Sequence, residues 1–280
     1  MTKERYIIAV DMDGTLLNSK GKITENTVTT LKLLLDAGHY IVPASGRAFP
    51  ILPEEIKNIS GIQYAVLENG AVVWDWKKQM PISASLLPDG VAQQLLLQVK
   101  AEYPDERYYT EVIAGGIVCA EEADIPYYKD ATIEGNFEEY MLKDHEFVRD
   151  IHNRADILQR AEKINLYFED RAVSETLRKS WGKRSDVSVT TSVSGNAEFT
   201  SPDVNKGAGV AKLGRLLGIE KDHIIAIGDN ENDVDMFDEA GISVAMGNAS
   251  DSIKNKAVHV TYDNDHDGAA VFLQGYFKLV

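Results

Sequence analysis

The chain has 280 residues, an apolar fraction of 44% and a formal net charge of −15, from 29 basic and 44 acidic residues. This length predicts two domains, while the charge argues against nucleic acid and anionic membranes as partners. No apolar stretch approaches the roughly 18 residues that span a membrane, no signal-like segment precedes the first strand, and Cys119 is the sole cysteine, so a cytoplasmic protein is expected.

The first predicted strand covers residues 7–10 and runs directly into Asp-Met-Asp-Gly-Thr at residues 11–15. The glycine ends the strand, so both carboxylates lie in a loop at its carboxyl end, where open α/β sheets bind ligands. One acid can attack a substrate while the other donates a proton. An Asp-x-Asp-Gly sequence is also an ordinary surface turn, so this motif needs support from the rest of the chain.

A helix is predicted next, with Thr24 as its N-cap, leucines at helical spacing and Gly38 just past its end. The chain then returns through an apolar strand at residues 40–42 to Pro-Ala-Ser-Gly-Arg at residues 43–47. This βαβ pattern predicts two parallel strands. The alternation at residues 72–76, followed by two lysines, indicates a hairpin.

Between residues 85 and 200 the pattern changes to short aromatic and β-branched runs with few helices. This pattern predicts an α+β insert in a parallel α/β core. Residues 1–84 and 201–280 are expected to form the core domain, and residues 85–200 the insert. Helices are expected at 88–100 and 172–181, and strands at 108–113, 116–120, 164–168 and 187–192.

The last third repeats the pattern of the first. A helix from Lys206 is predicted to end at Gly218, and an apolar strand at residues 224–227 leads into the acidic loop Gly-Asp-Asn-Glu-Asn-Asp at residues 228–233. Another strand is expected at residues 243–245.

The motifs at residues 11–15, 43–47, 205–207 and 228–233 all lie at strand or helix ends. As an ordered set, supported by residues 69–71, 246–249 and 267–270, they resemble the haloacid dehalogenase (HAD) superfamily of phosphatases, closest to the Cof-type, subfamily IIB branch. The resemblance implies an α/β fold: a Rossmann-like parallel-sheet HAD core with an inserted α+β cap of type C2B, which selects the substrate.

Phosphoryl transfer needs a nucleophile, an acid for the leaving oxygen and neutralisation of the phosphate charge. Asp11 is the candidate nucleophile and would form an aspartyl-phosphate. Asp13 is the candidate acid and later base. Hard oxygen ligands suit Mg²⁺, for which Asp11 and Asp229 are candidate ligands; the resemblance adds the backbone carbonyl of Asp13.

Lys206 is the candidate cation beside the nucleophile and phosphate. Ser45, Gly46 and Asn232 are further candidates for phosphate binding. Asp233 is expected to orient a metal-bound water or Lys206; the alternative for Asn232 and Asp233 is that they cap the helix that follows. Arg47 is left outside the catalytic set, as a residue that could only tie down its loop.

Residues 263–268 match the first half of a calcium-binding EF-hand loop, but the twelfth position is Gln274 instead of glutamate. A strand-like run precedes this segment where an EF-hand has a helix. A loop that caps the C-terminal helix is therefore the preferred interpretation.

These residues together predict a Mg²⁺-dependent phosphatase for a small phosphorylated metabolite, with sugar phosphates as the first expectation and flavin mononucleotide or pyridoxal phosphate left open. A phosphosugar mutase and a non-catalytic regulatory protein on the same fold are the alternatives, and the oligomeric state stays undetermined. A mutase would need extra cations in the insert, which has Arg107, Lys129, Lys143, Arg149, Arg154, Arg160 and Lys163. Candidates for contact with the leaving group are Tyr108, Tyr109, Glu111 and Glu134.

Overall fold

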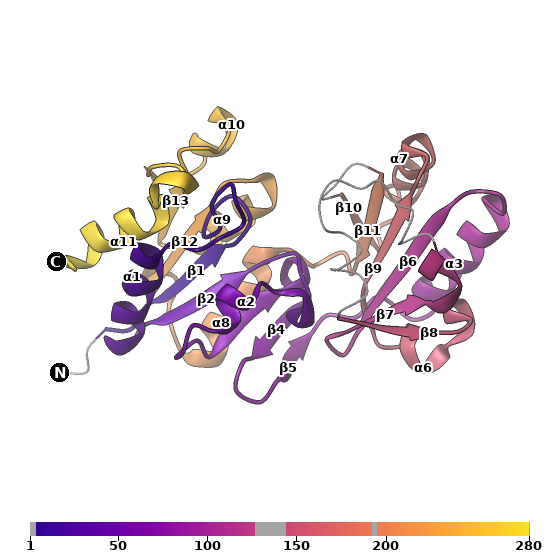
Figure 1. The fold of residues 1–280 in the computed structure, drawn as a ribbon, viewed down its shortest axis with the longest axis horizontal. Coiled ribbons are helices and arrows are strands. Elements are labelled where there is room, and N and C mark those ends of the chain that lie inside the picture. The colour runs from indigo at the N-terminus through magenta and orange to yellow at the C-terminus, as the bar shows by residue number, and fades with distance from the viewer. Residues whose placement is uncertain (1–3, 127–143, 192–194, 280) are drawn as a thin grey trace. The chain divides into compact units, whose positions relative to one another are not determined.

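The computed structural model describes residues 4–126, 144–191 and 195–279. The chain divides into two compact units (Figure 1). The core unit comprises Met1–Arg47, Leu52–Ser83 and Asn205–Val280, and the inserted unit comprises Ala48–Ile51 and Ala84–Val204. No helix in the described part of the chain is long and apolar enough to cross a membrane.

The core unit is built on an eight-stranded sheet that is mostly parallel. Its strands are β1 (Ile7–Asp11), β2 (Tyr40–Ala44), β3 (Tyr64–Leu67), β4 (Val72–Asp75), β5 (Met80–Ala84), β12 (Ile224–Gly228), β13 (Ile242–Ala245) and β14 (His259–Val260). Its helices are α1 (Glu25–Asp36), α2 (Glu54–Lys57), α8 (Lys206–Leu217), α9 (Val234–Glu239), α10 (Asp251–Lys254) and α11 (Gly268–Phe277).

The strand order in this sheet is β14-β13-β12-β1-β2-β3-β4-β5. The chain adds β2 and β3 on one side of β1 and later adds β12, β13 and β14 on the other side, so the strand order reverses between β1 and β12. Open α/β sheets bind ligands outside the carboxyl ends of their strands at such a switch point. Asp11 ends β1, and the acidic loop follows β12.

The central strands are buried on both faces, which explains their continuous apolar sequences. Ile7 and Ala9 of β1 have no exposed surface and share a cluster with Val210 and Leu213 of α8. Because side chains alternate along a strand, Ile8 lies on the opposite face, where it is also fully buried. This burial fixes the register of β1 and hence the place of Asp11 at its end.

The two helices that carry the predicted N-caps begin where the sequence indicates. The Thr24 side chain accepts a hydrogen bond from Thr27 N at the start of α1. Asn205 accepts one from Ala208 N at 2.7 Å and thereby sets Lys206 as the first residue of α8. Gly218 ends α8 in the left-handed conformation, with φ +67°.

The inserted unit contains a six-stranded sheet in the order β10-β11-β9-β6-β7-β8. Its strands are β6 (Tyr108–Ala114), β7 (Ile117–Glu121), β8 (His145–Val148), β9 (Ala161–Phe168), β10 (Ser188–Thr190) and β11 (Asn196–Thr200). Its helices include α3 (Val91–Glu102), α6 (Ala155–Leu158) and α7 (Arg171–Trp181). All neighbouring strands are antiparallel except β7 and β8.

Apolar side chains of α3 and α7 pack against one face of this sheet and form the core of the inserted unit. On the other face, Ala48 and Ile51 from the segment after β2 pack against Ile113 and Val118. The inserted unit therefore takes part of its packing from a segment that directly follows the Ser-Gly-Arg loop.

The expected fold class is confirmed: an α/β core with a mostly parallel sheet and an α+β insert. The hairpin expected after residue 72 is β4 and β5, which are neighbours in the sheet. β9 is longer than expected and begins at Ala161, because its pairing with β6 continues past the apolar run. β8 was not expected from the sequence, since its residues, His-Glu-Phe-Val, show no clear alternation.

Candidate active site

Asp11 lies at the carboxyl end of β1, and only 6% of its surface is exposed. The Lys206 ammonium, buried at the start of α8, donates to Asp11 Oδ1 at 2.6 Å and to Asp233 Oδ1 at 2.7 Å. A buried ammonium between two carboxylates is stable because each charge compensates the other. Lys206 therefore joins the end of β1 to the loop after β12.

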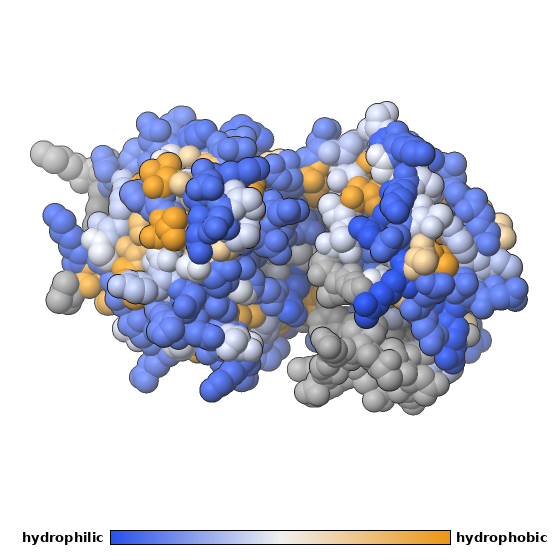
Figure 2. All heavy atoms as spheres, turned by 90° about the horizontal axis from the view of Figure 1, so that it is seen from above, coloured by the Kyte–Doolittle hydropathy of each residue, from blue (hydrophilic) through white to orange (hydrophobic). Residues whose placement is uncertain are grey.

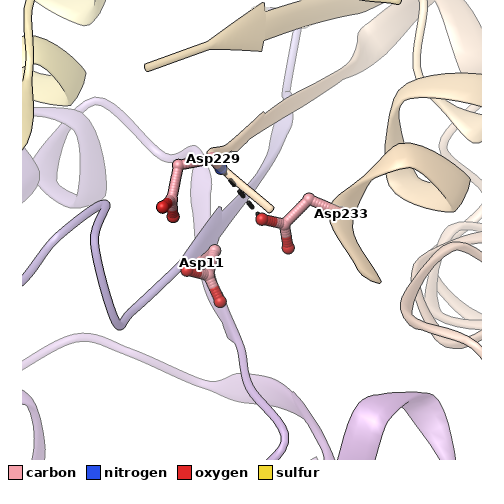
Figure 3. Close-up of side chains that lie close together, drawn as sticks. All are labelled: Asp11, Asp229 and Asp233. Carbon is pink, nitrogen blue, oxygen red and sulfur yellow. Dashed lines mark hydrogen bonds between the residues drawn. The ribbon is translucent and has the colours of Figure 1, made fainter. Parts of the chain in front are cut away.

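Asp233 is fully buried, and its second oxygen is also occupied. Asp233 Oδ2 accepts a hydrogen bond from the backbone N–H of Asp229 at 2.9 Å (Figure 3). It also accepts one from the backbone N–H of Asn230 at 3.0 Å. Asn230 is the N-cap of the short helical turn here, and Asp233 completes its capping box. The Asp233 side chain does not cap α9, the helix that follows it; its carboxylate instead closes the preceding loop and contacts Lys206.

The Asp229 carboxylate points toward Asp11 from the end of β12 (Figure 3). Thr15 Oγ1 donates to Asp229 Oδ1 at 2.9 Å, and Asn248 Nδ2 donates to Asp229 Oδ2 at 3.2 Å. Gly14 has φ +85°, and a Cβ atom there would lie 2.5 Å from Asp229 Oδ2. The glycine in the first motif is therefore required both for the backbone turn and for the approach of Asp229.

Burial disfavours the charged forms of the acids in this cluster. It raises the pKa of Asp11 to about 8, with the charge of Asp233 acting in the same direction and Lys206 opposing it. Burial also raises the pKa of Asp229. For Lys206, burial alone would lower the pKa, but the carboxylates of Asp11 and Asp233 outweigh it and raise the pKa. An additional cation would favour the ionised acids.

The donor set fits a small divalent cation. Asp11, Asp229 and Asp233 each offer a carboxylate oxygen within 4.8 Å of the others, and the three ionised acids together with Lys206 carry a net charge of −2. Both oxygens of Asp233 already accept hydrogen bonds, whereas Asp11 Oδ2 receives none from the described residues. Asp11 and Asp229 are candidate ligands because their carboxylate oxygens lie close together, and oxygen ligands suit Mg²⁺.

The side chain of Asp13 lies outside this cluster. Its carboxylate is more than half exposed and forms a two-pronged ion pair with Arg47, from Nε at 3.0 Å and Nη2 at 2.9 Å. Bidentate pairs of this kind fix side-chain geometry. Both oxygens of Asp13 are therefore occupied by the guanidinium of Arg47.

The expected phosphate-binding residues come from the loops that follow β2 and β12. Ser45 is buried, and its hydroxyl accepts a hydrogen bond from Arg47 N at 3.2 Å. Asn232 is exposed, and its amide donates to Asn69 Oδ1 at 3.2 Å. Gly46 lies against the same Asn69 side chain. Their roles in binding phosphate stay predictions.

Sequence reasoning placed four residues that contact the predicted site outside the candidate set: Thr15, Arg47, Asn69 and Asn248. Each lies within a motif that the sequence singled out. Membership in these motifs could therefore have indicated that the four residues lie near the site. The sequence could not show which group each side chain contacts.

The acidic segment at residues 263–268 lies between β14 and α11, and its carboxylates are directed to separate protein donors. Asp265 accepts from Ser19 N at 2.9 Å, and Asp267 accepts from the hydroxyls of Thr24 and Thr27 at 2.6 and 3.1 Å. This arrangement ties the start of α11 to the start of α1, as expected for a capping loop.

Three candidates for contact with the leaving group lie on β6, and they point to different faces of the sheet. Tyr108 packs against Phe168 in the core of the inserted unit. Tyr109 lies on the opposite face and stacks on Tyr167 at a centroid distance of 4.3 Å. Glu111, on the same face as Tyr109, accepts hydrogen bonds within a buried network. Glu134, Lys129 and Lys143 lie outside the described residues.

A sequence model of haloacid dehalogenase-like hydrolases matches residues 8–273. The chain belongs to this family. It is 28% identical to the 5-amino-6-(5-phospho-D-ribitylamino)uracil phosphatase YitU of Bacillus subtilis over the full length of both chains. It is 31% identical to a putative phosphatase of Buchnera aphidicola, covering 97% of this chain and 95% of the relative. The resemblance to Cof-type HAD hydrolases is confirmed, and the protein is a phosphatase.

Solved structures show the same fold. TM0651 from Thermotoga maritima superposes with a TM-score of 0.79 at 23% identity and covers 97% of each chain. The HAD subclass IIB sugar phosphatase BT4131 superposes with a TM-score of 0.77 at 20% identity and covers 98% of this chain and all of its own.

Replacing Lys206 by methionine should strongly destabilise the protein in metal-free buffer, because Asp11 and Asp233 would lose their buried counter-charge. We expect the free energy of unfolding in urea to fall by about 3–5 kcal/mol, the usual cost of breaking a buried ion pair from one side. Lys212→Met on the same helix is the matched control and should have little effect. A Lys206→Met protein as stable as this control would show that the buried pair is unimportant.

Proposed function

We propose that this phosphatase uses Mg²⁺ to hydrolyse small phosphomonoesters through an aspartyl-phosphate on Asp11. The observation that carries the proposal is the position of Asp11: one oxygen is held by Lys206, while the other receives no hydrogen bond from the described residues. Lys206 fixes the orientation of the carboxylate and leaves Asp11 Oδ2 to attack. Asp229 lies close enough to share a cation with it.

In the first step, Asp11 Oδ2 attacks phosphorus, the bond from phosphorus to the leaving oxygen breaks, and Asp13 gives that oxygen a proton. In the second step, water attacks phosphorus, its proton goes to Asp13, and the bond from phosphorus to Asp11 breaks. Mg²⁺, held by Asp11 and Asp229, would neutralise charge on the phosphoryl oxygens. Lys206 stays paired with Asp233 throughout and keeps a positive charge beside the reacting group.

The ion pair between Asp13 and Arg47 fits this scheme as the arrangement before substrate binds. While the pair holds, both oxygens of Asp13 are bonded to the guanidinium of Arg47. A phosphate dianion also attracts a guanidinium, so a substrate phosphate near Arg47 would compete with Asp13 for it. Substrate binding would then release Asp13 to take up the proton that it later donates.

For the substrate, we propose a small phosphorylated metabolite such as a sugar phosphate. The names of two similar proteins support this class, since one is a phosphatase for a phosphoribitylamino-uracil and the other a sugar phosphatase. A mutase receives less support. Four of the cationic side chains in the described part of the insert form ion pairs with neighbouring acids: Arg107 with Glu169, Arg149 with Glu122, Arg154 with Asp156 and Lys163 with Glu198.

We further propose that the domain formed by residues 85–200 acts as the specificity cap, as the resemblance implies. The inserted unit holds none of Asp11, Asp229, Asp233 or Lys206, so its contribution would be to the leaving group. The buried polar face around Glu111 is the part best suited to this. Glu111 accepts hydrogen bonds from Asn165 at 2.8 Å and from His145 at 3.2 Å.

Asp11→Asn should abolish turnover of p-nitrophenyl phosphate while the protein stays folded, because the amide keeps the shape but cannot attack phosphorus. The loss in kcat should be at least about 10³-fold, the scale for removal of a covalent nucleophile. Asp36→Asn, at the end of α1 and away from the site, is the control. Rapid turnover by a folded Asp11→Asn protein would contradict the mechanism.

Removal of metal should stop hydrolysis, and Mg²⁺ should restore it, because the acids and the phosphate repel one another without a cation. The measurement is release of inorganic phosphate from a panel of phosphomonoesters, before and after treatment with chelator. The same assay should show free phosphate and no isomerised sugar. Full activity after thorough chelation would exclude the role of Mg²⁺, and isomerised product would favour the mutase.

Glu111→Gln should alter the order of preference within the same panel, because it keeps the size of the side chain but removes a buried charge. Relative kcat/KM values among natural phosphates should shift by about tenfold or more, the effect of one hydrogen bond to a charged group. Turnover of p-nitrophenyl phosphate should change little. Glu175→Gln on the exposed surface of α7 is the control, and an unchanged preference order in Glu111→Gln would exclude this face from selection.

A further inference from the structure

The loop after β3 has a backbone conformation that only specific surroundings can maintain. Glu68, Asn69 and Gly70 form a short helical turn, η2, in which all three residues have positive φ, at 56°, 55° and 99°. For a residue other than glycine, this left-handed conformation is less stable than the right-handed one by roughly 1–2 kcal/mol. Such strain persists where neighbouring structure fixes it and is concentrated at functional sites.

The backbone of this turn is bonded to the loop after β2. Glu68 N donates to Arg47 O at 3.1 Å, and Asn69 N donates to Ser45 O at 3.0 Å. The Ser-Gly-Arg loop is therefore held at both of its ends by the strained turn.

The same turn lies against the start of α8. A Cβ atom on Gly70 would be 1.9 Å from the carbonyl oxygen of Asn205, the N-cap that precedes Lys206. Only glycine permits this approach, since any side chain would collide with the backbone of the cap. One turn thus determines the positions of the loop after β2 and of the helix that presents Lys206.

The side chain of Asn69 completes the arrangement. Its Oδ1 accepts a hydrogen bond from Asn232 Nδ2 at 3.2 Å. A Cβ atom on Gly46 would lie 3.0 Å from the same oxygen. Asn69 therefore lies between Gly46 and Asn232, which come from loops on opposite sides of β1 and are both candidates for phosphate binding.

We propose that Asn69 is a positioning residue for the phosphate group of the substrate, acting through Asn232 and Gly46 without contact with the reacting atoms. The Asn232 amide nitrogen carries two hydrogens. Asn69 takes one and thereby fixes the direction of the other, which can bind a phosphoryl oxygen. This inference rests on the proposed function, in which Asn232 and Gly46 bind phosphate.

The test is Asn69→Gly, which removes the amide yet suits positive φ, so the fold should be retained. Affinity for inorganic phosphate, measured by titration calorimetry with Mg²⁺ present, should fall about tenfold, the effect of one hydrogen bond to a charged group. KM for p-nitrophenyl phosphate should rise in parallel, with kcat changed by about twofold or less. Gln79→Gly is the matched control, since Gln79 also has positive φ, at 54°, and lies in the turn between β4 and β5.

A double-mutant cycle distinguishes a role of Asn69 in orienting Asn232 from a general destabilisation of the fold. Asn232→Ala should weaken phosphate binding to a similar degree, and Asn69→Gly should add little in the Asn232→Ala background, because both changes remove one interaction. Additive effects, phosphate affinity equal to that of Gln79→Gly, or a loss confined to kcat would overturn the proposal.

Failure of this inference is distinguishable from failure of the proposed function. A wild-type protein that binds phosphate but hydrolyses no ester would contradict the proposed function, while the calorimetric comparison of variants would still decide the role of Asn69. A wild-type protein that hydrolyses esters, with Asn69→Gly unchanged in affinity, would contradict only the positioning role. A wild-type protein that neither binds phosphate nor hydrolyses esters would contradict both.

Discussion

The ammonium of Lys206 is buried between Asp11 and Asp233, and the geometry of the site depends on this contact. A charge so deeply buried is tolerated only with partners at short range. The contact requires α8 to begin at Lys206, β1 to end at Asp11 and the loop after β12 to turn back at Asp233. Three segments far apart in the sequence are thereby brought to one point at the switch between β1 and β12.

The same contact explains why the acids can remain close together. Burial favours protonation of Asp11 and Asp229, and Lys206 offsets only part of the repulsion among the carboxylates. A divalent cation would balance the remaining charge, so binding of Mg²⁺ would stabilise the ionised form that attacks phosphorus. The chain carries a net charge of −15, so attraction of an anionic substrate would depend on the local positive charges of Lys206 and Mg²⁺ and not on the net charge of the protein.

The sequence was informative where chemistry follows directly from local structure. Asp11 and Asp229 each come directly after or near the end of an apolar strand, and Lys206 opens an amphipathic helix, so their common location followed from the rule for parallel sheets. The pair between Asp13 and Arg47 could not be foreseen, because it depends on side-chain rotamers across two loops. Tyr108 and Tyr109 were equivalent in the sequence, and only the register of β6 against β9 assigned them to opposite faces.

The central claim is that Asp11 is phosphorylated during turnover. The most direct measurement is rapid acid quench of the enzyme mixed with Mg²⁺ and substrate, followed by borohydride reduction and mass spectrometry of the peptide that contains residues 11–13. An aspartyl-phosphate is reduced to homoserine, so we expect homoserine at position 11 and none in Asp11→Asn. Homoserine at position 13, or none at either position while phosphate is released, would contradict it.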